Sequence, residues 1–255
     1  MGRIIAVANQ KGGVGKTTTA VNLSACLAEA GKKTLIIDAD PQGNTTQGLG
    51  IDKSSLEETT YDILLQNKQM YDIIGENVYP NLDLLPANID LAGAEIELIQ
   101  VPDNSNILKK AIAEIKEEYD FIIIDCPPSL SLLTINALTA SDTVLVPLQC
   151  EFYALEGLSQ LMYTIGLIQD KLNPQLQIDG IVFTMYDART NLSLEVVEEV
   201  RRELTDTHIY QTIIPRNVRL SEAPSYGQPI AMYDPSSKGA IAYRELAQEV
   251  IQRRI

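Results

Sequence analysis

A glycine-rich loop near the N-terminus constrains the fold of this chain more than any other feature. Residues 10–18 read Gln-Lys-Gly-Gly-Val-Gly-Lys-Thr-Thr. The Gly-Lys-Thr ending fits a phosphate-binding loop, in which a glycine and four further residues precede Gly-Lys-Ser/Thr. However, Gln10 stands where the first glycine belongs, and Lys11 follows it as a second lysine. One lysine is enough to hold the phosphates of a nucleotide, so the second needs another purpose.

The residues on either side of the loop predict the strand and helix that this motif requires. Residues 3–9 form a short apolar run typical of a buried parallel strand. Residues 17–30 carry alanines and leucines at helical spacing, and Gly31 ends that helix. Glycine N–H groups and the helix N-terminus would then face phosphate oxygens. The loop residues expected to hold a nucleotide are Gly12, Gly13, Val14, Gly15, Lys16 and Thr17.

Within the loop, two side chains have separate expected roles. Lys16 would reach the β- and γ-phosphates, and the Thr17 hydroxyl would bind Mg²⁺. Both roles need the strand-loop-helix context, because it aims the two side chains at one point.

Strands that alternate with helices along the whole chain predict an α/β fold. Helical periodicity covers residues 154–172, 192–205 and 237–254. Such alternation predicts a mostly parallel, twisted sheet with helices on both faces, as in a P-loop NTPase. Without repeats or obvious linkers, residues 1–255 are expected to form one domain. The other runs expected to be strands are 33–38, 81–86, 119–125, 141–147, 178–185 and 210–215.

Composition excludes several classes of protein. No apolar run reaches the roughly 18 residues of a membrane span, and no secretion signal is evident. The three cysteines are far apart and match no zinc spacing, which favours reduced thiols in a cytoplasmic protein. We therefore expect a cytoplasmic enzyme rather than a membrane or secreted protein.

Three aspartates follow apolar strands and are expected at the edge of the sheet where ligands bind. Asp38 and Asp40 come after one strand, and Asp125 ends another in the manner of a Walker B acid. A carboxylate in this position can hold Mg²⁺, often through water. The alternative is an acid that only caps the next helix.

The charge of the chain is uneven. The formal net charge is −14, which argues against an evenly basic nucleic-acid binder. Residues 1–179 carry 11 lysines and arginines against 24 acids, whereas residues 180–255 carry 9 against 10. Eight of the nine arginines lie in the later part. Arginine is a good phosphate ligand, but ordinary ion pairs on helix surfaces explain the same composition.

Taken together, several motifs make the chain similar to the deviant Walker A ATPases, and most of all to the ParA/Soj partitioning ATPases. The resemblance runs from residue 3 to the end and suggests the short form of the family, without an N-terminal helix-turn-helix. The matching stretches are Lys11 to Thr18, Asp38-Ala-Asp-Pro-Gln42, Ile124-Asp-Cys-Pro-Pro-Ser129, Glu151 to Leu158, Met185 to Asn191 and Ile214 to Pro224.

The resemblance implies roles for residues of the nucleotide site. Lys11 would reach the nucleotide of the partner subunit in an ATP-dependent homodimer, where a cation stabilises charge on the transferred phosphate. Asp40 would orient the attacking water, and Asp38 would belong to the network of water around Mg²⁺. The remaining implied contacts are Thr18 at the α-phosphate, Pro215 and Asn217 beside the adenine, and Glu151 as a resting partner of Lys11.

The resemblance also implies binding partners. The family dimer binds double-stranded DNA without sequence specificity, and Arg189 and Arg219 are the best candidates here. A ParB/Spo0J-type centromere-binding protein would stimulate slow ATP hydrolysis, and the protein would be associated with the nucleoid. Weaker candidates for DNA contacts are Lys171, Arg202, Arg216 and Lys238.

Other functions of the same superfamily remain open on the sequence. A MinD-like ATPase at the membrane surface needs a basic amphipathic tail, whereas this chain ends at Arg253-Arg254-Ile255. A reductase resembling the nitrogenase iron protein needs cluster ligands that Cys26, Cys126 and Cys150 do not resemble. A small-molecule ligase or kinase also remains possible, although no substrate pocket is readable.

Overall fold

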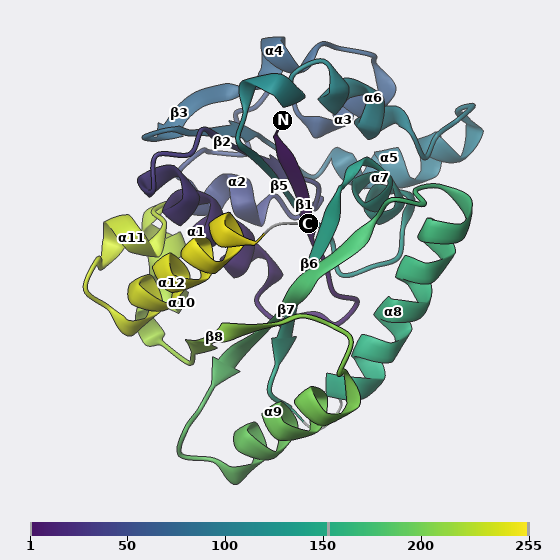
Figure 1. The fold of residues 1–255 in the computed structure, drawn as a ribbon. Coiled ribbons are helices and arrows are strands. Elements are labelled where there is room, and N and C mark those ends of the chain that lie inside the picture. Colours follow the sequence, from purple (N-terminus) through teal and green to yellow (C-terminus); the bar gives the residue numbers. More distant parts are fainter. Residues whose placement is uncertain (1, 152–153, 254–255) are drawn as a thin grey trace.

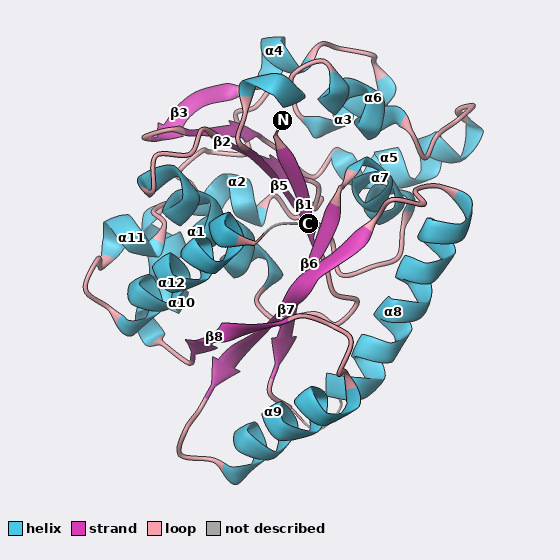
Figure 2. Cartoon of the chain, viewed as in Figure 1, coloured by secondary structure: helices cyan, strands magenta, loops and turns pink. Residues whose placement is uncertain are grey.

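The computed structural model describes residues 2–151 and 154–253, and within these ranges eight strands form one sheet (Figures 1 and 2). The strand order is β3-β4-β2-β5-β1-β6-β7-β8, and only the edge pair β3-β4 is antiparallel. The expected α/β class and mostly parallel sheet are therefore confirmed. The strands are β1 (Arg3–Val7), β2 (Thr34–Asp38), β3 (Gly75–Tyr79), β4 (Leu82–Leu85), β5 (Phe121–Asp125), β6 (Thr143–Gln149), β7 (Gln177–Tyr186) and β8 (Ile209–Pro215).

Helices cover both faces of the sheet (Figure 1). On one face, α1 packs against α12 and both contact the strands. On the other face lie α3 and α5 to α9. The helices are α1 (Lys16–Glu29), α2 (Asn44–Gly48), α3 (Thr60–Leu65), α4 (Met70–Ile73), α5 (Leu91–Glu97), α6 (Ile107–Ala113), α7 (Leu132–Ala140), α8 (Ala154–Lys171), α9 (Asn191–Glu203), α10 (Val218–Glu222), α11 (Ile230–Tyr233) and α12 (Lys238–Gln252), with short 3₁₀ turns η1 (Leu98–Gln100), η2 (Lys116–Glu118) and η3 (Ala223–Tyr226).

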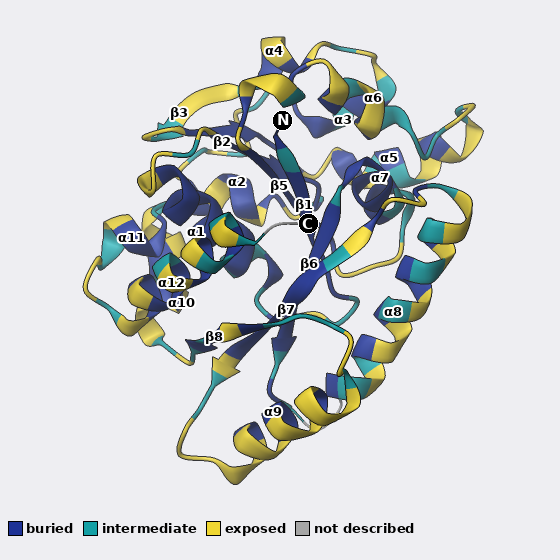
Figure 3. Ribbon diagram, viewed as in Figure 1, coloured by how far each residue is buried: buried dark blue, intermediate teal, exposed yellow. Residues whose placement is uncertain are grey.

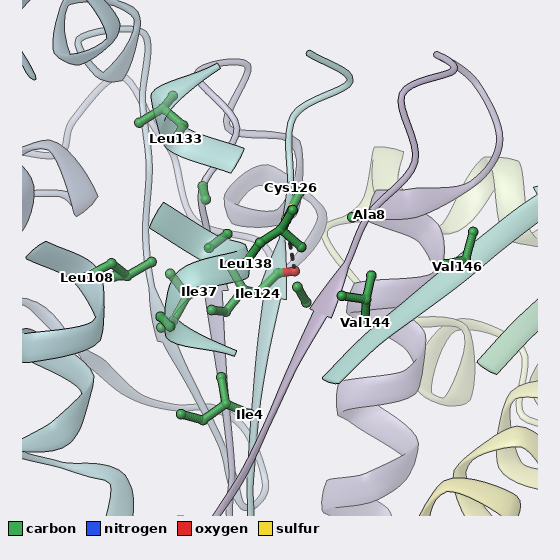
Figure 4. Packing of buried hydrophobic residues seen from close by; sticks show 14 of the residues in the cluster. Ile4, Ala8, Ile37, Leu108, Ile124, Cys126, Leu133, Leu138, Val144 and Val146 are labelled. Atoms are coloured by element: carbon green, nitrogen blue, oxygen red, sulfur yellow. Dashed lines mark hydrogen bonds between the residues drawn. The ribbon is translucent and has the colours of Figure 1, made fainter. Parts of the chain in front are cut away.

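Alternating side chains of the strands build a hydrophobic core on each side of the sheet. On β1, Ile4 and Ala6 join one core, whereas Ile5 and Val7 join the other. Successive residues of a strand point to opposite faces, so a strand that is buried on both sides is apolar throughout. Apart from β3, the strands are buried along most of their length (Figure 3), and Figure 4 shows residues of β1, β2, β5 and β6 that share one core with Leu133 and Leu138 of α7.

Strand β3, helix α7 and the short helices α2, α10 and α11 were not predicted from the sequence. Strand β3 is polar and largely exposed at the edge of the sheet, so it lacks the apolar run that marks the other strands. Helix α7 is buried on nearly every side, and an apolar run without a polar face has no helical periodicity. At the other end, the predicted helix 237–254 forms α12 as far as Gln252, while Arg254 lies outside the described residues.

Gly50 and Gly227 bring two distant loops into backbone contact, whereas Gly31 has the same kind of backbone without such a contact. Gly227 has a φ of +63°, and a Cβ atom added there would lie 2.5 Å from the Cα of Gly50. Gly31 has a φ of +80° but open space around the position of its Cβ.

We therefore predict that Gly227→Ala destabilises the fold more than Gly31→Ala. The left-handed backbone costs an alanine about 1–2 kcal/mol at either site, but only position 227 adds a collision with backbone atoms that cannot rotate away. Urea denaturation of both variants measures the difference. Equal losses of unfolding free energy would contradict the close packing of residues 50 and 227.

Candidate nucleotide-binding site

Three strands end together beneath the glycine-rich loop. In the sheet, Val7 of β1 and Asp38 of β2 both pair in register with Asp125 of β5. The chain that leaves β1 therefore starts the loop directly beside both carboxylates. This is the edge where parallel sheets bind ligands, as the positions of the residues in the sequence predicted.

The loop has the backbone of a phosphate-binding loop. Gly13 and Gly15 have φ values of +76° and +86°, a conformation that favours glycine. The carbonyl of Gly15 accepts the first helical hydrogen bond of α1, from Thr19 N at 2.8 Å. The hydroxyl of Thr184 on β7 donates to the carbonyl of Val14 at 2.8 Å and holds the loop against the sheet.

Lys16 lies inside this loop. Its Nζ donates to the backbone carbonyl of Lys11 at 3.0 Å, and only 7% of the residue is exposed. Burial lowers the pKa of Lys16, while the nearby carboxylate of Asp125 acts to raise it. The ammonium group is thus already aimed into the loop before any phosphate is bound.

Asp125 is fully buried and incompletely paired. Its Oδ2 accepts a hydrogen bond from the Thr45 hydroxyl at 2.8 Å, whereas Oδ1 accepts none from the residues that the structure describes. Burial raises the pKa of Asp125 to about 6, although neighbouring hydroxyl groups and Lys16 oppose the rise. A buried carboxylate oxygen without a donor is costly, which makes it a ready ligand for a cation.

The Asp38 carboxylate holds the loop that follows it. Oδ2 accepts from the backbone N and the hydroxyl of Thr46 at 2.9 and 2.7 Å, and Oδ1 accepts from Asp40 N at 3.2 Å. Burial and the charge of Asp125 raise the pKa of Asp38 to about 7. Asp40 is 7% exposed and its Oδ1 accepts from Gln42 N at 2.9 Å. The carboxylate of Asp38 thereby orients the loop that carries Asp40.

Sequence reasoning missed the two threonines that hold these acids. Thr45 and Thr46 are fully buried on α2 and bind Asp125 and Asp38 respectively. The available signal was a polar Asn-Thr-Thr run directly after the Asp38 to Gly43 loop. Such a run can cap a helix, and a capping role conceals the contact with the acids.

The acids and the threonine of this edge suit magnesium. Mg²⁺ prefers oxygen ligands and keeps several waters. Two oxygens at this edge fit these preferences. One is the unpaired Oδ1 of Asp125, and the other is the hydroxyl of Thr17, which lowers the pKa of the Asp125 carboxyl. Both oxygens of Asp38 are already occupied by protein donors, so Asp38 fits a supporting position better than direct contact with a metal.

Lys11 points to a different partner from Lys16. Its Nζ forms an ion pair with Glu151 Oε2 at 2.6 Å, and the two side chains are 35% and 46% exposed. Gln149 Nε2 donates to the other oxygen of Glu151 at 2.5 Å. The backbone N of Lys11 donates to Asn9 Oδ1 at 3.0 Å, which fixes the turn. Of the segment that begins at Glu151, residues 152–153 lie outside the described chain.

A cavity of about 690 Å³ adjoins the loop. Gly15 and Thr18 line one part of it, and Pro215 and Asn217 line another. Its size is in the range of small-molecule sites. The structure therefore brings together the loop and the segment at 215–217 that the resemblance assigned to the adenine.

The two arginines expected to bind DNA are exposed but paired with acids. Arg189 donates to both oxygens of Asp187, at 2.8 and 2.6 Å, and holds the pKa of that carboxyl well below its usual range. Arg219 pairs with Glu222 at 2.8 Å and approaches Asp234 at 3.5 Å. A phosphate at either site would have to compete with a carboxylate.

The weaker basic candidates divide into paired and unpaired residues. Arg202 pairs with Glu199 and Glu203 on α9. Within residues 2–151 and 154–253, the exposed side chains of Lys171, Arg216 and Lys238 form no ion pair. Arg216 also lines the 690 Å³ cavity, so it lies close to the nucleotide site.

The chain is similar to known proteins over nearly its whole length. A model of the AAA domain matches residues 2–178. The chain is 60% identical to the sporulation initiation inhibitor protein Soj of Bacillus subtilis over 250 residues, covering 98% of each chain. It is 51% identical to the chromosome partitioning protein ParA of Myxococcus xanthus, covering 99% of this chain and 89% of that protein.

A solved structure has the same fold. Cobyrinic acid a,c-diamide synthase from Mycobacterium smegmatis, with bound ADP and magnesium, is 40% identical and superposes with a TM-score of 0.86. The match covers 99% of this chain and 95% of that one. The fold match thus extends over nearly the whole chain.

We predict that Asp125→Asn stabilises the free protein at high pH. The folded state raises the pKa of Asp38 to about 7 and of Asp125 to about 6, whereas unfolded aspartates titrate near pH 4. The folded state therefore binds more protons between these values, so unfolding free energy falls as pH rises through this window. Removing one buried charge should restore about 3 kcal/mol at pH 8 and about half as much at pH 5, because pH 5 lies between the unfolded and the folded pKa.

Urea denaturation in EDTA at both pH values tests this prediction, with the surface change Asp206→Asn as control. A variant Asp125→Asn that is less stable than the wild type at pH 8 would show that the Asp125 carboxylate contributes favourably to the free fold.

Proposed function

The chain belongs to the family of Soj and ParA partitioning ATPases, and on that premise we propose that bound ATP turns it into a DNA-binding homodimer. It is an ATP hydrolase, and we assign the whole of residues 1–255 to this one activity. The observation that supports the switch most strongly is the division of labour between the two lysines of one loop. Lys16 is buried in the loop, whereas Lys11 is held outside it by Glu151.

ATP and Mg²⁺ complete the site at the edge of the sheet. When bound, Mg²⁺ would neutralise negative charge that develops on the phosphates during phosphoryl transfer. Lys16 and the loop N–H groups bind the phosphates, and Thr17 and Asp125 hold the metal. Asp40 orients the attacking water. Its position is fixed because its Oδ1 accepts a hydrogen bond from Gln42 N and its own backbone N donates to Asp38 Oδ1. Thr18 contacts the α-phosphate, and Pro215 and Asn217 contact the adenine.

Lys11 acts on the nucleotide of the second subunit. Its ammonium is partly exposed, and its only ion pair among the described residues is with Glu151, whose carboxylate is 46% exposed. A pair this accessible to water contributes little to stability, on the order of 0–1 kcal/mol. The ion pair between Lys11 and Glu151 can therefore break at a small cost in free energy when Lys11 binds a phosphate in the partner subunit. Dimerisation then depends on ATP.

Arg189 and Arg219 contribute to non-specific contacts with DNA in the dimer. Because Asp187 and Glu222 compete for these guanidinium groups, each contact is weak alone. Two subunits present twice the number of contacts, so affinity for DNA rises when ATP joins them. Arg216, Lys171 and Lys238, whose side chains are exposed, are further candidates, whereas Arg202 is held by acids of its own helix.

Partner and location follow from the same function. A ParB/Spo0J-type centromere-binding protein stimulates hydrolysis and releases the dimer from DNA. The protein acts in the cytoplasm on nucleoid DNA. Among the helices that the structure describes, none combines the length and apolar character needed to cross a bilayer.

We predict that the two lysine variants lose different properties of the protein. Lys16→Ala should lose ATP binding, because the side chain inside the loop is removed. Lys11→Ala should still bind ATP but lose ATP-dependent dimerisation and slow turnover at least a hundredfold, in line with the roughly 10³-fold or larger effect of a trans-acting cation. Binding of a fluorescent ATP analogue and light scattering measure the two properties.

Asp40→Ala serves as the control for this pair of variants. It leaves both lysines in place and should accumulate an ATP-bound dimer. A Lys11→Ala protein that dimerises and hydrolyses ATP like the wild type would contradict the assigned role of Lys11.

We predict that Arg189→Glu weakens DNA binding and leaves ATP-dependent dimerisation intact. Charge reversal removes one phosphate contact per subunit and adds repulsion, so affinity should fall by about tenfold or more at low salt. The salt dependence of binding to plasmid DNA should also become shallower. Arg201→Glu is the control, because Arg201 is an exposed arginine of α9 that is not among the candidates for DNA contact. Equal effects of both changes would refute a specific contact at Arg189.

A further inference from the structure

Helix α5 exposes an apolar stripe that no described element covers. Ile89, Ile96 and Ile99 are 66%, 71% and 69% exposed, and Ala92 lies between them. A turn precedes the helix, in which the carbonyl of Ile89 accepts from Ala92 N at 3.0 Å, and Ile99 lies in the 3₁₀ turn η1 that follows the helix. The spacing of three and four residues places all four side chains on one side of the helix.

The buried side of the same helix is a separate surface. Leu91, Ala94 and Leu98 point into the core of the protein. Helix α5 is therefore apolar on two sides, although packing of the fold needs only one. A single exposed isoleucine is ordinary, but a turn-spaced row of them marks a binding surface.

Carboxylates surround the stripe. A groove of about 480 Å³ runs between α3 and α5, next to Ile89, and Glu57, Asp62, Asp90 and Glu97 line it. The carboxylate of Asp62 caps α3 by accepting from Thr59 N.

Within residues 2–151 and 154–253, no lysine or arginine forms an ion pair with the other acids of the groove. The ion pairs in this part of the chain join Lys68 to Glu58 and Lys110 to Asp103, and both acids lie outside the groove. The carboxylate of Glu97 accepts a hydrogen bond from the hydroxyl of Tyr61. Residues 69–108 contain no lysine or arginine at all. Lys68 interacts with the charge of Asp62, but the groove keeps more negative than positive charge.

Charge and shape together select the occupant. DNA is excluded because its phosphates are repelled by this groove. A segment that offers apolar side chains on one side and lysines or arginines beside them satisfies both the stripe and the groove. None of these residues belongs to the nucleotide site, so binding here leaves that site accessible.

We propose that the outer side of α5, formed by Ile89, Ala92, Ile96 and Ile99, together with the acidic groove, docks a positively charged amphipathic segment of the protein that stimulates ATP hydrolysis. The proposal rests on the proposed function, since it locates the partner of that ATPase. Helix α5 follows β4, which pairs with β2, and β2 leads directly into the Asp38 to Gln42 loop. Only the strands β4 and β2 thus separate the docked segment from Asp40, the residue assigned to orient the attacking water.

The test uses the purified ParB/Spo0J-type protein encoded in the same genome. Two variants address the two parts of the surface, Ile96→Ser for the stripe and Glu97→Lys for the groove. Matched controls on α12 are Ile241→Ser, at an isoleucine that is 47% exposed, and Glu245→Lys one turn later. Binding is measured by biolayer interferometry, and stimulated and basal ATP hydrolysis are measured in parallel.

Each surface variant should weaken binding about tenfold, as residues central to an interface do, and lose most of the stimulation. Basal hydrolysis and ATP-dependent dimerisation should stay at the wild-type level, and the controls should behave as the wild type. Binding to the wild type should also weaken with salt.

Three outcomes would overturn the proposal. Unchanged binding by both surface variants would remove the docking surface while leaving the proposed function intact. Loss of ATP-dependent dimerisation in Ile96→Ser would show that a second copy of the chain covers the stripe. A partner protein that neither binds nor stimulates the wild-type chain would refute the proposed function and the docking surface together.

Discussion

The in-register ends of three parallel strands are the constraint on which the functional site depends. Pairing of Val7 and Asp38 with Asp125 places two carboxylates side by side in a fully buried position. Burial raises the pKa of both acids, and the charge of Asp125 raises the pKa of Asp38 further, so this edge is strained electrostatically in the free protein. Lys16 and the threonines of α2 relieve part of that strain, and on the proposed function Mg²⁺ relieves the rest. The two buried carboxylates thus destabilise the free protein and favour the binding of a cation and a nucleotide.

The two lysines of the loop illustrate how one short segment can serve two subunits. Glycine conformations at residues 13 and 15 turn the loop so that Lys16 lies within it and hydrogen bonds to the Lys11 carbonyl. The same turn sends the Lys11 side chain outward to Glu151. On the proposed function, the inner lysine binds the subunit's own ATP and the outer one binds the ATP of its partner. Nucleotide binding and dimerisation thereby share one loop.

Much of this could be predicted from the sequence, because buried parallel strands are apolar along their whole length and acids at their ends are conspicuous. The strand before Asp125 and the loop at 10–18 are examples. Helix α7 and strand β3 were missed because one is apolar on every side and the other is polar. The hydrogen bonds of Thr45 and Thr46 could not be predicted, since they join residues that only folding brings together. The acidic partners of Arg189 and Arg219 lie two and three residues away, so sequence proximity could have revealed them.

The central claim, that Lys11 works across the dimer, is tested most directly by mixing two inactive variants. Lys11→Ala retains Asp40, and Asp40→Ala retains Lys11. In a mixed dimer, one site combines its own Asp40 with the Lys11 of the other subunit and is complete. Each mixed dimer carries one complete site out of two, so the mixture should hydrolyse ATP well above the rate of either variant alone and at no more than about half of the wild-type rate. A mixture that stays as inactive as its separate components would contradict a role for Lys11 in the neighbouring subunit.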